Sequence, residues 1–217
     1  MSAVASATPG RAGATLPMVL DLGYLRAHDL PEAGGKAVNL GELLAIGTPV
    51  PPGFVVTTAA YDEVVATNGL ATLLTQAAAT GDGAAARAAF AAAEIPGPIA
   101  AAILGAYRAL GGGSVAVRSS ATAEDLPGAA FAGQQDTLLG IRDEAALLQA
   151  VRQCWGSLWS DRAISYRQQR GFAQEPVALA IVVQRMVAAD AAGVMFTANP
   201  VTGARNQTVI DASTGLG

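Results

Sequence analysis

The sequence predicts an α+β fold, in which helices and strands are mixed. A long Ala-rich stretch is helical in character, several short apolar segments are typical of strands, and no unit of about 20–50 residues repeats along the chain. The 217 residues are 52% hydrophobic and 14% charged. That composition can bury the core of one large domain or two small lobes, and it argues against disorder over most of the chain.

The chain begins with residues 1–18, which are rich in Ala, Ser, Gly and Pro and are expected to form a flexible leader. They lack the basic start and apolar core of a signal peptide. Residues 19–25 are expected to be a short ordered segment. A helix is then predicted from near Gly35 to near Gly47, because leucines share one helical face: Leu40, Leu43 and Leu44.

Prolines follow this helix and force the chain into an extended segment: Pro49, Pro51 and Pro52. Residues 55–57 are predicted to form a strand, and residues 58–110 a series of helices. The breaks in that series fall at Gly69, Gly81–Gly83 and Pro96–Pro98. Three consecutive glycines, Gly111–Gly113, predict a hinge or a tight turn.

The second half is predicted to open with a strand over residues 115–118 and a long loop of small residues over 119–136. Loops of that length in compact domains are often lids or binding loops. Residues 137–141 predict another strand. Asp143 then caps a helix whose apolar face carries Leu147, Val151, Cys154 and Leu158. A second helix is predicted from Asp161 to Gly171.

The remaining segments predict strands over residues 178–186, 193–198 and 208–212, joined by short turns into an antiparallel meander. The sequence thus divides into the leader, an N-terminal helical part over 19–113 with a Gly-Gly-Lys motif, and a remainder over 114–217.

Composition excludes several function classes. The net charge is −4, without a run of Lys or Arg, so the electrostatic footprint of a nucleic-acid or anionic-membrane binder is missing. Charged and proline residues interrupt the most apolar stretch, residues 88–110, before it reaches the length of a membrane span. One cysteine excludes an internal disulfide and a cysteine-based zinc site, and one histidine, His28, excludes triads and histidine-based metal sites. A cytoplasmic protein is expected.

The Gly34-Gly35-Lys36 motif is the first candidate site. Glycines at a helix start let the backbone approach a ligand, and the exposed amides of the first turn favour phosphate. Ala37 stands where a Walker motif would need Ser or Thr. The alternative is a plain Gly-Gly turn followed by a solvated lysine.

A second candidate site runs from Arg118 through the hydroxyls of Ser119 and Ser120 to acidic residues. Arginine at the end of a strand can bind phosphate bidentately, or it can form a surface salt bridge with those carboxylates. Small residues around Gly133 could cover a phosphate chain with backbone amides, or could simply return the loop to the next strand.

Gln184 lies in an apolar strand, where a buried amide must either satisfy backbone groups or contact a ligand. Cys154, Trp155 and Trp159 are expected to pack in the core.

Four ordered segments resemble the nucleotide-binding domain of the family of phosphoenolpyruvate synthase, pyruvate phosphate dikinase and rifampin phosphotransferase: GGKAVNLGELLAIGTPVPPGFVVTT, VAVRSSATAEDLPGAAFAGQQDTLLGI, CWGSLWSDRAISYRQQRGF and VVQRMVAADAAGVMFTANPVTG. The resemblance covers residues 19–217 and implies an ATP-grasp-like fold that holds Mg-ATP between two lobes. It implies that ATP is split to AMP and phosphate. The β-phosphoryl then passes through a histidine on a separate domain to pyruvate, or to rifampin in the antibiotic-modifying branch.

The resemblance also assigns residues. Lys36 and Arg118 match phosphate contacts, Gly133 and Thr137 match the loop that caps the phosphates, and Gln184 matches a nucleotide contact near the base. The metal ligands (for Mg²⁺), a further arginine, and the phosphohistidine and acceptor domains come later in such enzymes. No catalytic or metal-binding residue is therefore assigned here, and the isolated chain is expected to lack turnover. A non-catalytic nucleotide- or partner-binding remnant is the alternative.

Overall fold

The computed structural model describes residues 17–121, 137–169 and 177–216. Contacts divide the chain into two compact units, residues 1–186 and residues 187–217. The first unit contains every described residue of the predicted site.

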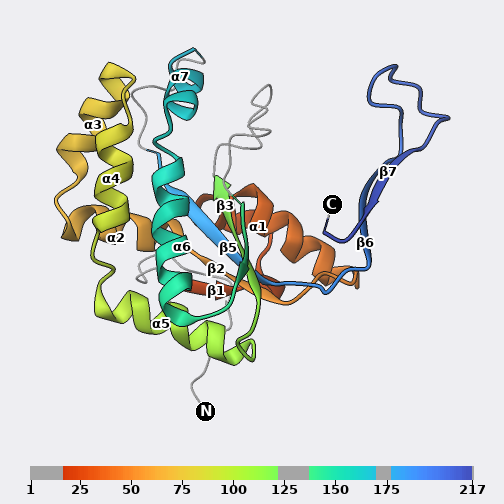
Figure 1. Cartoon of the computed structure of the whole chain (residues 1–217), viewed down its shortest axis with the longest axis horizontal. Coiled ribbons are helices and arrows are strands. Elements are labelled where there is room, and N and C mark those ends of the chain that lie inside the picture. The colour runs from red at the N-terminus through yellow and green to blue at the C-terminus, as the bar shows by residue number, and fades with distance from the viewer. Residues whose placement is uncertain (1–16, 122–136, 170–176, 217) are drawn as a thin grey trace. The chain divides into compact units, whose positions relative to one another are not determined.

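An antiparallel sheet forms the centre of the first unit, and its described strands follow the order β1-β2-β5-β3-β4 (Figure 1). In that order the strands are β1 (Val19–Asp21), β2 (Gly53–Val56), β5 (Leu179–Arg185), β3 (Val115–Ala121) and β4 (Thr137–Ile141). β5 is the last of these strands in the sequence but pairs with both β2 and β3. It is buried on both faces over Leu179–Gln184, as its continuous apolar run favours.

One face of the sheet contacts α1 (Leu30–Ala45) (Figure 1). Two short 3₁₀ helices, η1 (Leu22–Tyr24) and η2 (Ala27–Asp29), lead from β1 into it. Alanines of α1 pack there against alternate residues of the strands, in a small apolar cluster with Val55 and Val182. The small alanine side chains let the helix approach the sheet closely. We call this side of the sheet the α1 face.

The other face carries the large core. The helices on this side are α2 (Thr58–Thr67), α3 (Ala71–Thr80), α4 (Ala84–Ala92), α5 (Gly97–Ala109), α6 (Glu144–Ser157) and α7 (Asp161–Gln169). The predicted series of helices over residues 58–110 is confirmed with its breaks at Gly69 and Gly81–Gly83, whereas α5 already begins at Gly97, inside the break predicted at Pro96–Pro98. Asp143 accepts a hydrogen bond from the Ala146 amide (Oδ1···N, 2.8 Å), so the predicted cap of α6 is also confirmed.

Aromatic residues fill this core. Trp155 and Tyr61 are almost completely buried, and the Trp155 indole donates to the carbonyl of Leu179 (3.1 Å). The Trp159 indole donates to the Tyr61 hydroxyl (3.0 Å). Cys154 is fully buried on the same side. The predicted core positions of both tryptophans and of the cysteine are therefore confirmed.

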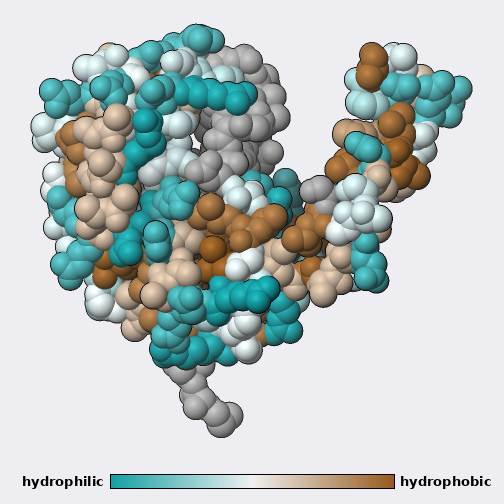
Figure 2. All heavy atoms as spheres, in the orientation of Figure 1, coloured by the Kyte–Doolittle hydropathy of each residue, from teal (hydrophilic) through white to brown (hydrophobic). Residues whose placement is uncertain are grey.

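The second unit is a hairpin of β6 (Ala191–Phe196) and β7 (Val209–Thr214). The predicted three-strand meander is wrong, because β6 and β7 pair with each other whereas β5 belongs to the sheet of the first unit. Large apolar side chains are exposed on the hairpin, as Figure 2 shows: Val194, Met195, Phe196 and Ile210. An isolated two-stranded hairpin is only marginally stable in water.

Two smaller differences concern strand and helix bounds. The expected loop over residues 119–136 begins later, because Ser119–Ala121 extend β3 by pairing with the first residues of β5. The rest of that loop lies outside the described residues, as does Gly171, the expected end of α7.

No single helix in the described ranges is long and apolar enough to cross a membrane. Only α4 and α5 taken together, across a 77° bend, reach that length and composition.

Candidate functional site

Gly34 interrupts α1 and sets the start of the helix that carries Lys36. Its backbone has φ 74° and ψ 162°, a combination that is essentially restricted to glycine. A Cβ at this position would lie 2.3 Å from the carbonyl oxygen of Ser120, so the residue must also be small. The predicted helix start near Gly35 is confirmed, although a helical turn from Leu30 precedes the break. Lys36 consequently lies in the first turn after Gly34.

Two adjacent residues of this turn bind two adjacent residues of β3. The Lys36 ammonium donates to the carbonyl oxygen of Ser119 (Nζ···O, 2.6 Å). The Ala37 amide donates to the hydroxyl of Ser120 (N···Oγ, 3.2 Å) in a buried position. The Gly-Gly-Lys segment is therefore attached to the end of the strand that carries Arg118, although the sequence separates them by about 80 residues.

Arg118 projects from β3 onto the α1 face. Val115, Val117 and Ala121 of this strand join the large core on the opposite side, and side chains alternate along a strand. The side chain is half-buried, and its Nε is shielded from solvent without a hydrogen-bond partner among the described residues. Buried polar atoms are normally paired, so this guanidinium is suited to a partner that a ligand supplies.

Thr137 and Gln184 lie on the same face as Arg118. Thr137 is the cross-strand partner of Arg118 on β4 and is exposed. Gln184 on β5 is directly opposite Ala116, two residues before Arg118 on β3. Its side-chain amide is 7% exposed and donates to the carbonyl of Pro51 (Nε2···O, 2.9 Å). The structure thus shows the backbone contact that was one of the two expectations for this glutamine.

The described members of the predicted site are therefore brought together on the α1 face, from α1, β3, β4 and β5: Lys36, Arg118, Thr137 and Gln184. Gly133 lies outside the described residues. His28 is exposed on η2, with Nε2 3.6 Å from the carboxylate of its neighbour Asp29. The geometry offers the guanidinium of Arg118 on the α1 face of β3 and the ammonium of Lys36 bound to the next residue of that strand, which suits a polyanionic ligand.

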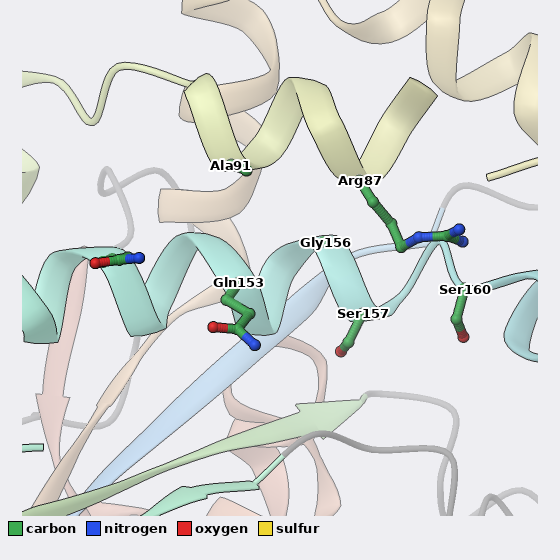
Figure 3. Close-up of a pocket in the computed structure, with 7 residues that line it drawn as sticks. Arg87, Ala91, Gln153, Gly156, Ser157 and Ser160 are labelled. Carbon is green, nitrogen blue, oxygen red and sulfur yellow. The ribbon is translucent and has the colours of Figure 1, made fainter. Parts of the chain in front are cut away.

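A separate pocket of about 320 Å³ lies between α4 and α6, on the core side of the sheet. Figure 3 shows Arg87 extending from α4 toward the C-terminal end of α6, where Ser157 and Ser160 lie. The Arg87 guanidinium is already hydrogen-bonded to Asp161 (Nη1···Oδ1, 2.9 Å) and to the carbonyl of Trp159 (3.0 Å). This interaction lowers the pKa of the Asp161 carboxyl. None of the predicted site residues lines the pocket, so we do not assign the ligand to it.

Comparison with known proteins identifies the family. Residues 30–217 match the sequence family described as "Pyruvate phosphate dikinase, AMP/ATP-binding domain". The chain belongs to this family. The predicted resemblance and the ATP-binding assignment are thereby confirmed, whereas the roles of the individual residues stay predictions.

Several curated relatives of this dikinase-family domain are much longer proteins. The chain is 45% identical over 209 residues to a probable phosphoenolpyruvate synthase of Methanothermobacter thermautotrophicus, covering 89% of this chain and 30% of the relative. It is 42% identical over 217 residues to a phosphoenolpyruvate synthase of Aeropyrum pernix (92% and 26%). It is 43% identical over 211 residues to a rifampicin phosphotransferase of Bacillus cereus (92% and 24%). The chain spans less than a third of each of these relatives.

Clustered metal-binding side chains are absent from the described part of this domain. No group of three or more His, Cys, Asp or Glu residues in those ranges is arranged to hold a metal ion.

Two features of the site were missed from sequence. Ser120 was noted only as one of several hydroxyls, and its bond to α1 depends on a pairing that no local pattern predicts. Lys36 is also the only lysine among the 13 lysine and arginine residues of the chain. That isolation was a compositional signal that could have singled it out.

Proposed function

We propose that the chain binds the phosphates of ATP on the α1 face and is the ATP-binding part of a phosphotransferase of the phosphoenolpyruvate synthase type. The observation that carries this proposal is the bond of the Lys36 ammonium to Ser119, the residue that follows Arg118 on β3, together with the Arg118 Nε, which is buried without a described partner. The family description as an AMP/ATP-binding domain supports the choice of ligand.

The chemistry of phosphate binding follows from these groups. An ammonium has three donors, so Lys36 can keep its bond to Ser119 and still donate to a phosphate oxygen. Arg118 offers the planar fork that matches two phosphate oxygens. The first-turn amides that follow Gly34 add the positive end of a helix dipole. Thr137, the exposed cross-strand partner of Arg118, is proposed to contact the same phosphate chain.

Gln184 is proposed to contact the base. The Pro51 carbonyl can only accept a hydrogen bond, so the amide nitrogen of Gln184 must face it. This leaves the amide oxygen as an acceptor for the amino group of adenine.

For the whole enzyme we propose an ATP-grasp-like site that a second lobe completes. Mg²⁺ is held there by residues other than those described. ATP is cleaved to AMP and phosphate, and the β-phosphoryl passes through a phosphohistidine domain to pyruvate. Rifampin is the alternative acceptor, since rifampicin phosphotransferase and phosphoenolpyruvate synthase relatives have nearly the same identity to this chain.

The test of the proposed site is calorimetric titration of the purified chain with Mg-ATP. Lys36→Ala and Arg118→Ala should each weaken binding about tenfold or more, which is the effect of losing a hydrogen bond to a charged group. Arg142→Ala is the matched control. Arg142 is an exposed arginine that follows the last residue of β4, whereas Thr137 is the first residue of that strand. Equal binding by wild type and both site variants would remove the assignment.

A further inference from the structure

We propose that Ser120 is a positioning residue for Lys36. Ser120 lies on β3 and caps the part of α1 that carries Lys36. The proposal rests on the function proposed above, because the position of Lys36 matters there for contact with phosphate. Three contacts between α1 and the end of β3 carry it.

The first contact, between Gly34 and the backbone of Ser120, explains why the cap comes from β3 and not from α1 itself. A side chain at the residue before a helix usually accepts a hydrogen bond from the amide two or three residues into the helix. Here that residue is Gly34, which has no side chain, and a Cβ would collide with the Ser120 carbonyl oxygen. The Ser120 hydroxyl accepts from Ala37 instead, at the third position after Gly34. Ser120 thus supplies the oxygen that Gly34 lacks.

The second and third contacts connect this cap to the lysine. These are the hydrogen bonds from Lys36 to Ser119 and from Ala37 to Ser120. They lie side by side, because they join two consecutive residues of α1 to two consecutive residues of β3. Ser120 is completely buried, and the Ala37 bond is buried as well. Without the hydroxyl, the Ala37 amide would be a buried donor without an acceptor. The first turn would then have to shift toward another partner, and Lys36 would move with it.

The experiment compares Ser120→Ala, Ser120→Thr and Ser157→Ala in the 217-residue chain. Ser157 is the matched control, because it is also a buried serine, its hydroxyl donates to a helix carbonyl (Cys154, 2.7 Å), and it lies on α6 at the opposite face. The first readout is the ¹⁵N-edited ammonium signal of Lys36, which is unambiguous because the chain has a single lysine. Ser120→Ala should shift or broaden this signal, and the other two variants should leave it near its wild-type position.

The second readout is affinity for Mg-ATP. Ser120→Ala should weaken binding about two- to tenfold, the range for loss of one neutral hydrogen bond, and Ser120→Thr should restore it. In the background of Lys36→Ala, the Ser120→Ala change should have no further effect, because Ser120 acts through Lys36. This double-mutant cycle does not depend on the threonine variant, which has to place an extra methyl group in a buried position.

Each outcome has a distinct meaning. An unchanged ammonium signal in Ser120→Ala would overturn the proposal, and so would an equal loss of affinity with and without Lys36. If the wild-type chain binds no Mg-ATP while the ammonium signal still depends on the Ser120 hydroxyl, the proposed function fails and the positioning of Lys36 stands.

Discussion

Replacing Gly34 with alanine should destabilise the first unit strongly, for two separate reasons. The backbone at φ 74° and ψ 162° costs a residue with a side chain about 1–3 kcal/mol. The new Cβ would also lie 2.3 Å from the Ser120 carbonyl oxygen, so α1 and β3 must separate. That movement breaks the Ala37–Ser120 bond, which adds about 1 kcal/mol for a neutral hydrogen bond. The expected loss is therefore about 2–4 kcal/mol.

The assay is unfolding by heat and by urea, followed by far-UV circular dichroism. A loss of about 2–4 kcal/mol should lower Tm by roughly 5–15 °C in a domain of this size. The matched control is Gly47→Ala. Gly47 also has a positive φ of 82°, but nothing lies within 4 Å of the position of its Cβ. Alanine there should cost only about 1 kcal/mol. The reasoning is refuted if the two variants melt within about 2 °C of each other.

Three further predictions concern other parts of the chain. The Arg87 guanidinium lowers the pKa of Asp161, so the stabilisation from this pair is present at neutral pH and is lost as pH falls through the native pKa; the Tm difference between wild type and Asp161→Asn should accordingly vanish in acid, and a constant difference would contradict it. Cys154 should resist a thiol reagent in the native chain and react fully in urea, because it is completely buried; rapid native labelling would oppose this. Gln184→Leu should weaken binding of Mg-ATP about two- to tenfold but leave inorganic tripolyphosphate binding unchanged; equal losses would show that Gln184 does not contact the base.

The parts of the fold that depend on neighbouring residues could be predicted from the sequence. The glycines before Lys36 and the cap at Asp143 act within one helical turn, and the structure has both helix starts as expected. The position of β5 could not be predicted in this way. Its apolar run identifies a buried strand, but the strands it pairs with come from distant parts of the chain, whereas consecutive strands favour a meander.

The candidate site shows the same division. Lys36, Arg118 and Gln184 were found from residue type and resemblance, because each lies in a recognisable segment. The bond that attaches Ala37 to Ser120 spans 83 positions of the sequence. Periodicity and capping patterns act over a few residues and cannot predict a bond over this sequence distance. The bond depends instead on how α1 packs on the sheet. The sequence therefore singled out the candidate residues, and the structure was needed to show that the described ones share one face of the sheet and what holds α1 there.

The central position of β5 has a consequence for synthesis of the protein on the ribosome. Translation releases β1, β2, β3 and β4 first, yet the β1–β2 pair and the β3–β4 pair are joined only through β5. Until Leu179–Arg185 has emerged, β2 and β3 each present an unpaired edge in the nascent chain. The face of the sheet that carries Arg118 and Gln184 is therefore completed only after residues 179–185 have emerged, when β5 enters between β2 and β3.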